Sequence, residues 1–217
     1  KPKQLWSDLG DGEPVRVVEL EDEHAEARFV VSEIAGLIDQ GLPGSGIAVF
    51  YRTNAQSRVL EDLLARQQVA YRVIGGPRFY ERAEIKDAIA YLTLLTNPSD
   101  AVGLARVMNR PRRGIGNTTL DRLRVYAESQ SITLWEAVGR AAEAGLRPAT
   151  ERSVNQFFAL IQSVAAEREG IGVSALLELI LERTGYVEAL EGERTVEADG
   201  RIENLQELVS VAHEFEA

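Results

Sequence analysis

The stretch "PRRGIGNTTLDRL", residues 111–123, has the composition of a helix end, a tight turn and the start of a second helix. The turn is residues 114–116, in which one apolar residue, Ile115, stands between two glycines. We expect Ile115 to anchor the turn in a core, and Thr118 or Thr119 to cap the following helix. The stretch therefore predicts a helix–hairpin–helix motif.

The same turn has the features of an anion site. Gly114 and Gly116 leave the backbone N–H groups and the start of the next helix open to approach, and both features attract phosphate. Arg112 and Arg113 add positive charge within a window, residues 101–120, that contains four arginines and no acid. The motif is predicted to hold duplex DNA by its phosphates, whatever the base sequence. The alternative is an ordinary turn between helices that needs its glycines for positive φ.

The chain from residue 97 onward has helical periodicity. "TNPSD", residues 96–100, contains a proline that ends one helix, and either of its last two residues can cap the next. Thr133 and Glu136 have the spacing of a capping box. Residues 191–200 have the composition of a loop. Helices are expected at residues 102–109, 119–129, 134–144, 153–167, 174–184 and 201–214.

The chain before residue 97 alternates between two kinds of pattern. Short apolar runs, typical of strands, are found at residues 15–20, 47–50 and 71–76. Helical periodicity follows each run, at residues 21–40, from about residue 56, and at residues 83–95. Strands that alternate with helices predict a parallel sheet covered by helices. The sequence therefore predicts an α/β domain, residues 1–96, followed by an all-α domain, residues 97–217.

Tyr51 and Arg52 follow the predicted strand at residues 47–50. Ligands of open α/β sheets bind at the carboxyl ends of the strands. A tyrosine there can stack on a base, and an arginine can reach a phosphate with its planar fork of donors. The alternative is that Tyr51 packs on a neighbouring helix and Arg52 makes a surface ion pair.

A second aromatic and basic group lies within residues 75–87. Two glycines precede Arg78, Phe79, Tyr80 and Arg82, a composition that suits a single-stranded nucleic acid, with aromatics for bases and arginines for phosphates. The alternative is that Phe79 and Tyr80 belong to the core, and we favour this for at least one of them.

Bulk composition excludes several classes of protein. The 217 residues include no cysteine, which excludes disulfides and thiolate metal sites and fits a reducing cytoplasm. A net charge of −10 argues against binding nucleic acid by overall electrostatics, so only a local basic patch remains. No apolar run approaches the roughly 20 residues that span a bilayer. We expect a cytoplasmic protein without a membrane partner.

Two further absences limit the chemistry that the chain can perform. No carboxylates have the spacing of a metal site, and there is no G-x-x-x-x-G-K-[S/T] phosphate loop. We expect no metal site, and any nucleotide that Arg52 meets must be held mainly by residues outside this chain. Because the chain begins at Lys1 and its single methionine is Met108, we also expect a piece of a longer protein.

Three runs together resemble one family of enzymes: "AVFYRTNAQSR" (residues 48–58), "GGPRFYERAEIKDAIAYL" (75–92) and "NRPRRGIGNTTLDRL" (109–123). The chain resembles part of a superfamily 1 DNA helicase of the UvrD/PcrA/Rep type, and the resemblance extends through residues 201–215. It implies a partial RecA-like motor, subdomain 2A, over residues 1–96. It also implies most of a helical insertion, subdomain 2B, over residues 97–217.

The resemblance implies roles for individual residues. Residues 51–58 match motif IV, in which Tyr51 stacks on the adenine of ATP and Arg52 reaches the γ-phosphate as an arginine finger. Residues 114–116 match the duplex-gripping hairpin of subdomain 2B. ATP would be used with Mg²⁺, whose ligands lie outside this chain, in the missing subdomains 1A and 1B.

The implied parent is an ATP-dependent helicase that moves 3′ to 5′ and meets single-stranded DNA and duplex junctions. This chain alone is then expected to be inactive. Two rival functions stay open: a pure duplex DNA-binding module, and a helicase relative whose helical region docks other proteins. A Walker A loop elsewhere in the complete protein would separate the helicase from the module, and substitution of Arg112 and Arg113 would separate DNA contact from docking.

Overall fold

The computed structural model describes residue 8 and residues 12–216, and every regular element within them is a helix. The α-helices are α1 (Glu23–Asp39), α2 (Ser57–Arg66), α3 (Ala83–Thr96), α4 (Ala101–Val107), α5 (Asn117–Gln130), α6 (Leu134–Gly139), α7 (Pro148–Glu167), α8 (Val173–Arg183), α9 (Tyr186–Glu191) and α10 (Val196–Glu216). Short 3₁₀ turns are η1 (Gly44–Gly46), η2 (Asn54–Gln56), η3 (Phe79–Glu81) and η4 (Ala141–Ala144). None of the helices described is both long and apolar enough to cross a membrane.

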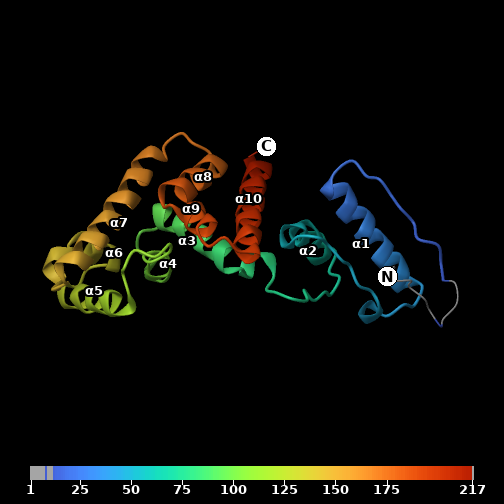
Figure 1. Cartoon of the computed structure of the whole chain (residues 1–217), viewed down its shortest axis with the longest axis horizontal. Coiled ribbons are helices and arrows are strands. Elements are labelled where there is room, and N and C mark those ends of the chain that lie inside the picture. The colour runs from blue at the N-terminus through green and yellow to red at the C-terminus, as the bar shows by residue number, and fades with distance from the viewer. Residues whose placement is uncertain (1–7, 9–11, 217) are drawn as a thin grey trace, which may run out of the picture.

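The helices are arranged along one long axis (Figure 1). α1 and α2 lie at one end, α5, α6 and α7 lie at the other, and α3 runs between them. α10 packs on α3, α8 and α9 and also contacts η2, the turn that leads into α2. The last long helix of the chain therefore connects the helical region to the N-terminal third.

The predicted parallel sheet is wrong for the residues that the structure describes. Residues 15–20, 47–50 and 71–76 contain no strand and no ladder of hydrogen bonds. Val17 and Phe50 are each 93% exposed, so these runs lack a partner within the described chain. Their apolar composition indicates a preference for strand, but a strand forms only where a neighbour accepts and donates its backbone hydrogen bonds.

The main core is built by the helices that the sequence predicts best. It extends from Phe79, in η3, to Leu208, in α10, and Tyr91 and Leu104 join α3 to α4 within it. A smaller cluster joins Val31 and Ile34 of α1 to Leu64 of α2. The main core includes residues on both sides of residue 97, and the domain boundary predicted there remains a prediction.

Helix ends confirm some capping predictions and correct others. The Asp100 side chain accepts hydrogen bonds at the start of α4, and Thr133 forms the predicted capping box with Glu136. The prediction that a threonine caps α5 is wrong, because Gly116 is the N-cap and both threonines lie in the first helical turn. The predicted loop at residues 191–200 is also partly wrong, since α10 already begins at Val196.

Candidate nucleic-acid and nucleotide sites

The turn between α4 and α5 is shaped by one side chain, that of Asn109. Its Oδ1 atom accepts hydrogen bonds from the backbone N–H groups of Arg113, at 2.7 Å, and Ile115, at 3.2 Å. Ile115 is buried in the main core, as predicted, and so anchors the turn from inside. Gly114 has a φ of +75°, a conformation that favours glycine. Sequence reasoning missed Asn109, although it stands beside the motif.

The backbone of this turn offers free hydrogen-bond donors. The N–H groups of Gly116, Asn117 and Thr118 donate to no atom in the described part of the chain. A side-chain carbon placed on Gly116 would meet nothing within 4 Å, so the approach to these donors is open. They stand at the start of α5, a helix of 14 residues, where the partial positive charge of a helix attracts anions.

Exposed arginines stand beside these donors. A hollow of about 660 Å³ is lined by the turn and by Arg106, Arg110 and Arg112. Arg106 is paired with the buried Asp87 at 2.6 Å, but Arg110 and Arg112 are exposed and form no salt bridge within residues 12–216. Asp87 also lines the hollow, but it is paired with Arg106, so among the described lining residues the charges of Arg110 and Arg112 remain in excess. Arg110 was not among the predicted site residues, although it lies in the acid-free window.

Arg113 faces the interior of the protein. Its guanidinium donates hydrogen bonds to the carbonyl oxygen of Arg110 at 2.9 Å and to that of Thr184 at 3.2 Å. It also lies 5.4 Å from the centre of the Phe157 ring. These contacts occupy the donors that a phosphate would need, so the geometry favours a positioning role for this arginine. The guanidinium of Arg112, its neighbour, donates to no atom of the residues that the structure describes.

The loop at residues 51–56 presents Arg52 to solvent. The Gln56 side chain accepts from the backbone N–H groups of Arg52, at 2.8 Å, and Thr53, at 3.0 Å, which fixes the main chain of the loop. Tyr51 is half-buried, whereas Arg52 is exposed and forms no ion pair with any described residue. The alternative of a surface ion pair for Arg52 is therefore not seen.

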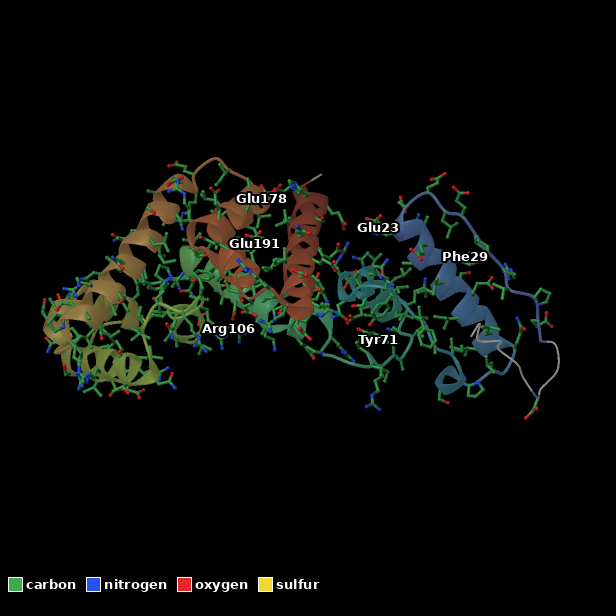
Figure 2. All side chains as sticks on the ribbon, in the orientation of Figure 1. Glu23, Phe29, Tyr71, Arg106, Glu178 and Glu191 are labelled. Carbon is green, nitrogen blue, oxygen red and sulfur yellow. The ribbon has the colours of Figure 1, made fainter. Side chains whose placement is uncertain are left out.

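The second aromatic group divides between core and surface. Phe79 is fully buried, which confirms that at least one of the two aromatics is a core residue. Tyr80 is 44% exposed. Arg78 is exposed and lies 5.0 Å from the centre of the Tyr71 ring, a cation–π contact. Figure 2 shows Tyr71 and Arg106 on the same long side of the molecule.

Two buried arginines tie this region to α10, and sequence reasoning missed both roles. Arg58 forms ion pairs with Glu207 and, at 3.0 Å, with Glu214. Burial lowers the pKa of Arg58, but the hydrogen bond and charge of Glu207 and the charges of Glu214 and Asp62 raise it, and the net shift is upward. Burial lowers the pKa of the second arginine, Arg82, whose partners are given below. These contacts join residues more than 120 positions apart, so no local pattern could reveal them.

The described residues contain one group of side chains with metal-ligand chemistry, Glu23, His24 and Glu214, whose ligand atoms lie within 4.8 Å of one another. Glu214 already accepts from Arg58, so a cation would compete with a guanidinium for that carboxylate. The group is better explained as an ion-pair cluster between α1, α2 and α10.

The fold and these sites define a helical protein with a helix–hairpin–helix motif and an exposed arginine loop. A family model, the UvrD-like helicase C-terminal domain, matches residues 1–217. The ATP-dependent DNA helicase PcrA of Staphylococcus aureus (strain NCTC 8325 / PS 47) is 37% identical over 216 residues, which cover 100% of this chain and 30% of that protein. The ATP-dependent DNA helicase UvrD1 of Mycobacterium tuberculosis (strain CDC 1551 / Oshkosh) is 42% identical over 219 residues, which cover 99% of this chain and 28% of that protein.

The chain therefore belongs to the UvrD-like helicase C-terminal domain family. It spans less than a third of the length of the curated relatives that it matches. The resemblance to UvrD/PcrA-type helicases inferred from the sequence is confirmed.

Proposed function

We propose that this chain is the part of an ATP-dependent 3′–5′ DNA helicase that supplies an arginine to the ATP site and contacts DNA through its helical region. The observation that carries the proposal is the exposed Arg52 on a loop held by Gln56, in a chain without a phosphate loop of its own. Such an arginine suits a nucleotide that another part of the protein binds. The relatives are named ATP-dependent DNA helicases, which supports this reading.

Arg52 and Tyr51 have separate parts in the proposed ATP site. The guanidinium of Arg52 stabilises the negative charge that develops on the γ-phosphate during phosphoryl transfer. Tyr51, half-buried, stacks on the adenine and orients the nucleotide. The relatives are named ATP-dependent, and the proposal places ATP with Mg²⁺ at this site, with the ligands of the ion outside this chain.

In this proposal, residues of the hairpin bind duplex DNA. Arg112 and the N–H groups near Gly114 and Gly116 bind phosphate, and the exposed Thr118 with the neighbouring Thr119 can add hydroxyl donors. Ile115 anchors the turn, and Arg113 holds it in place from behind. Arg78, beside Tyr71, is proposed to contact the single strand.

The partners of this chain are then DNA, as single strand and as duplex junction, and the remaining helicase subdomains 1A and 1B. A helicase that acts on bacterial DNA works in the cytoplasm, which is the location that we propose. A non-enzymatic role as a duplex-binding or protein-docking module is the second candidate. One feature favours this second candidate: the helical region makes up far more of the chain than the loop that bears Arg52.

The test is substitution of Arg52 in the complete helicase. Arginine fingers contribute about 10³–10⁵ in kcat, so Arg52→Ala should lower ATP turnover by orders of magnitude while DNA affinity stays unchanged. Arg52→Lys should restore little, because a point charge does not reproduce the planar fork. Arg66→Ala, an exposed arginine at the end of α2, is the matched control. Near-normal turnover in Arg52→Ala would leave Arg52 as a surface residue and favour the module.

A further inference from the structure

The loop that bears Arg52 is held at two points. One is the Gln56 side chain, which accepts from the N–H groups of residues 52 and 53. The other is the carbonyl oxygen of Asn54, which accepts a hydrogen bond of 2.9 Å from the guanidinium of Arg82. The first contact lies within the loop itself, whereas the second ties the loop to Arg82 at the start of α3, and η2 also packs against α10.

Arg82 is a buried residue whose side-chain hydrogen bonds go to this region and to α10, and its guanidinium also lies 5.3 Å from the centre of the Phe79 ring. It is 6% exposed, and its second terminal nitrogen donates to the hydroxyl of Ser57 at 2.8 Å. Its first terminal nitrogen, which holds Asn54, also donates to Oδ1 of Asn204 at 2.6 Å. One guanidinium therefore joins η2, the start of α2 and the middle of α10.

Asn204 orients that guanidinium from α10. The side chain of Asn204 is buried, and its amide nitrogen donates to the Glu84 carboxylate at 2.7 Å. This second bond fixes which side of the amide faces Arg82. Glu84 stands in the first turn of α3, so the orientation of Asn204 depends on both α3 and α10.

We propose that Asn204 and Arg82 are positioning residues for Arg52: α10 holds the arginine loop in its catalytic geometry through the chain Glu84, Asn204, Arg82 and the carbonyl of Asn54. The proposal rests on the proposed function of Arg52 at the γ-phosphate. It also assigns α10 a role in ATP hydrolysis, although neither of the residues that we place at the nucleotide, Tyr51 and Arg52, lies in α10. A shift of α10 against α2 would then change the rate of turnover.

The first test compares kcat and KM in the complete helicase. Asn204→Ala removes the contact that orients Arg82, and a misplacement of about 1 Å at a catalytic group can cost about 10²-fold in rate. We expect kcat for ATP to fall by about 10- to 100-fold, with KM within about threefold, because Arg52 acts on the transition state and not on ground-state binding. Tyr186→Phe is the control, because it removes another buried hydrogen bond, to Asp87 at 2.7 Å, that does not reach the loop.

The second test is a double-mutant cycle with Arg52→Ala. If Asn204 acts through Arg52, adding Asn204→Ala to Arg52→Ala should change kcat by less than about twofold, since the two effects are coupled. A further loss equal to that of the single variant would overturn the positioning role. Near-normal turnover in Arg52→Ala alone would instead overturn the proposed function, so the two failures are distinguishable.

The third test exchanges the amide and the carboxylate of the hydrogen bond between Asn204 and Glu84. Asn204→Asp alone places two carboxylates side by side and should lower kcat, because like charges repel and the bond to Glu84 is lost. Asn204→Asp combined with Glu84→Gln lets the new amide donate to the new carboxylate, which still accepts from Arg82. We expect this pair to recover kcat to within about threefold of the natural protein. A folded double variant without recovery would overturn the proposal.

Discussion

Arg113 donates a hydrogen bond of 3.2 Å to the carbonyl oxygen of Thr184, which lies 71 residues further along the chain. The bond joins the hairpin to the end of α8, and the same guanidinium also donates to the carbonyl oxygens of Val107 and Arg110. Arg113 is therefore part of the support of the hairpin, while its neighbour Arg112 is part of the surface.

The two arginines should respond differently to substitution. Arg113→Ala leaves the carbonyl oxygens of Pro111 and Thr184 without a donor among the described residues, and should destabilise the chain by about 2 kcal/mol. This corresponds to a fall in Tm of about 4–8 °C for a chain of this size. Arg112→Ala should leave Tm unchanged. Thermal unfolding followed by circular dichroism measures both, and an unchanged Tm in Arg113→Ala would contradict the supporting role.

The capping box of α6 should make the free energy of unfolding depend on pH in the acidic range. Hydrogen bonds from the backbone N–H and then the hydroxyl of Thr133 lower the pKa of Glu136 below its ordinary value of 4.5. A carboxyl with a lowered pKa in the folded state stabilises the protein above the unfolded pKa. That contribution is lost as the pH falls through the folded pKa.

Glu136→Gln should therefore be less stable than the natural chain near about pH 7 and nearly equal to it near about pH 3. The amide keeps an acceptor for Thr133 but has no charge to lose. Urea midpoints at the two pH values measure the difference. A gap between the two proteins that does not narrow in acid would show that the charge of Glu136 contributes nothing.

Local patterns predicted the features that depend on neighbours in sequence. The capping box needs residues three apart, and the helices expected at residues 83–95 and 153–167 follow from a period of 3.6 residues. The hairpin was predicted because its glycines, its apolar anchor Ile115 and its arginines are adjacent. Each of these is decided within one or two turns of chain.

Features that depend on distant partners were missed or were wrong. The three apolar runs have strand composition, but their pairing depends on other segments, and the described chain contains no partner for them. Arg82 and Asn204 are 122 residues apart, and neither has a local pattern that points to the other. Arg112 and Arg113 look alike in sequence, and only the position of Thr184 separates them.

Arg110 and Arg112 should set the salt dependence of DNA binding. Both are exposed beside the free N–H groups, and each phosphate contact removed lowers the slope of log K against log salt by about 0.9 for B-DNA. Arg110→Ala with Arg112→Ala should therefore lower the slope by about 2 and weaken duplex binding whatever the base sequence. Fluorescence anisotropy of a labelled junction over a salt series gives the slope.

The control for this pair is Arg152→Ala, which removes one exposed positive charge from α7, away from the hollow. It should leave the slope unchanged, because a distant charge releases no counterion from the bound DNA. If the double variant and the control give the same slope as the natural protein, the hairpin makes no phosphate contact. Protein docking then becomes the better function for the helical region.

Substitution of the two glycines of the hairpin distinguishes an effect on backbone conformation from an effect on phosphate contact. Gly114 has a φ of +75°, so Gly114→Ala should be destabilising by about 1 kcal/mol or more, whatever the ligand does. Gly116 has a φ of −83°, which any residue adopts, and a methyl group there meets nothing within 4 Å. Gly116→Ala should therefore fold, and because Ala is a poorer N-cap than Gly, its Tm should fall by no more than about 2–4 °C, the equivalent of about 1 kcal/mol.

The same methyl group adds bulk at the residue that bears the first of the N–H groups that donate to no described atom. If a phosphate binds there, Gly116→Ala should weaken junction binding by about tenfold, the equivalent of one charge-assisted hydrogen bond of about 1.5 kcal/mol. Anisotropy and thermal unfolding of one preparation measure affinity and folding together. Weaker binding by a variant that folds with only this small fall in Tm supports a phosphate contact at the start of α5, whereas unchanged binding would mean that DNA does not approach it.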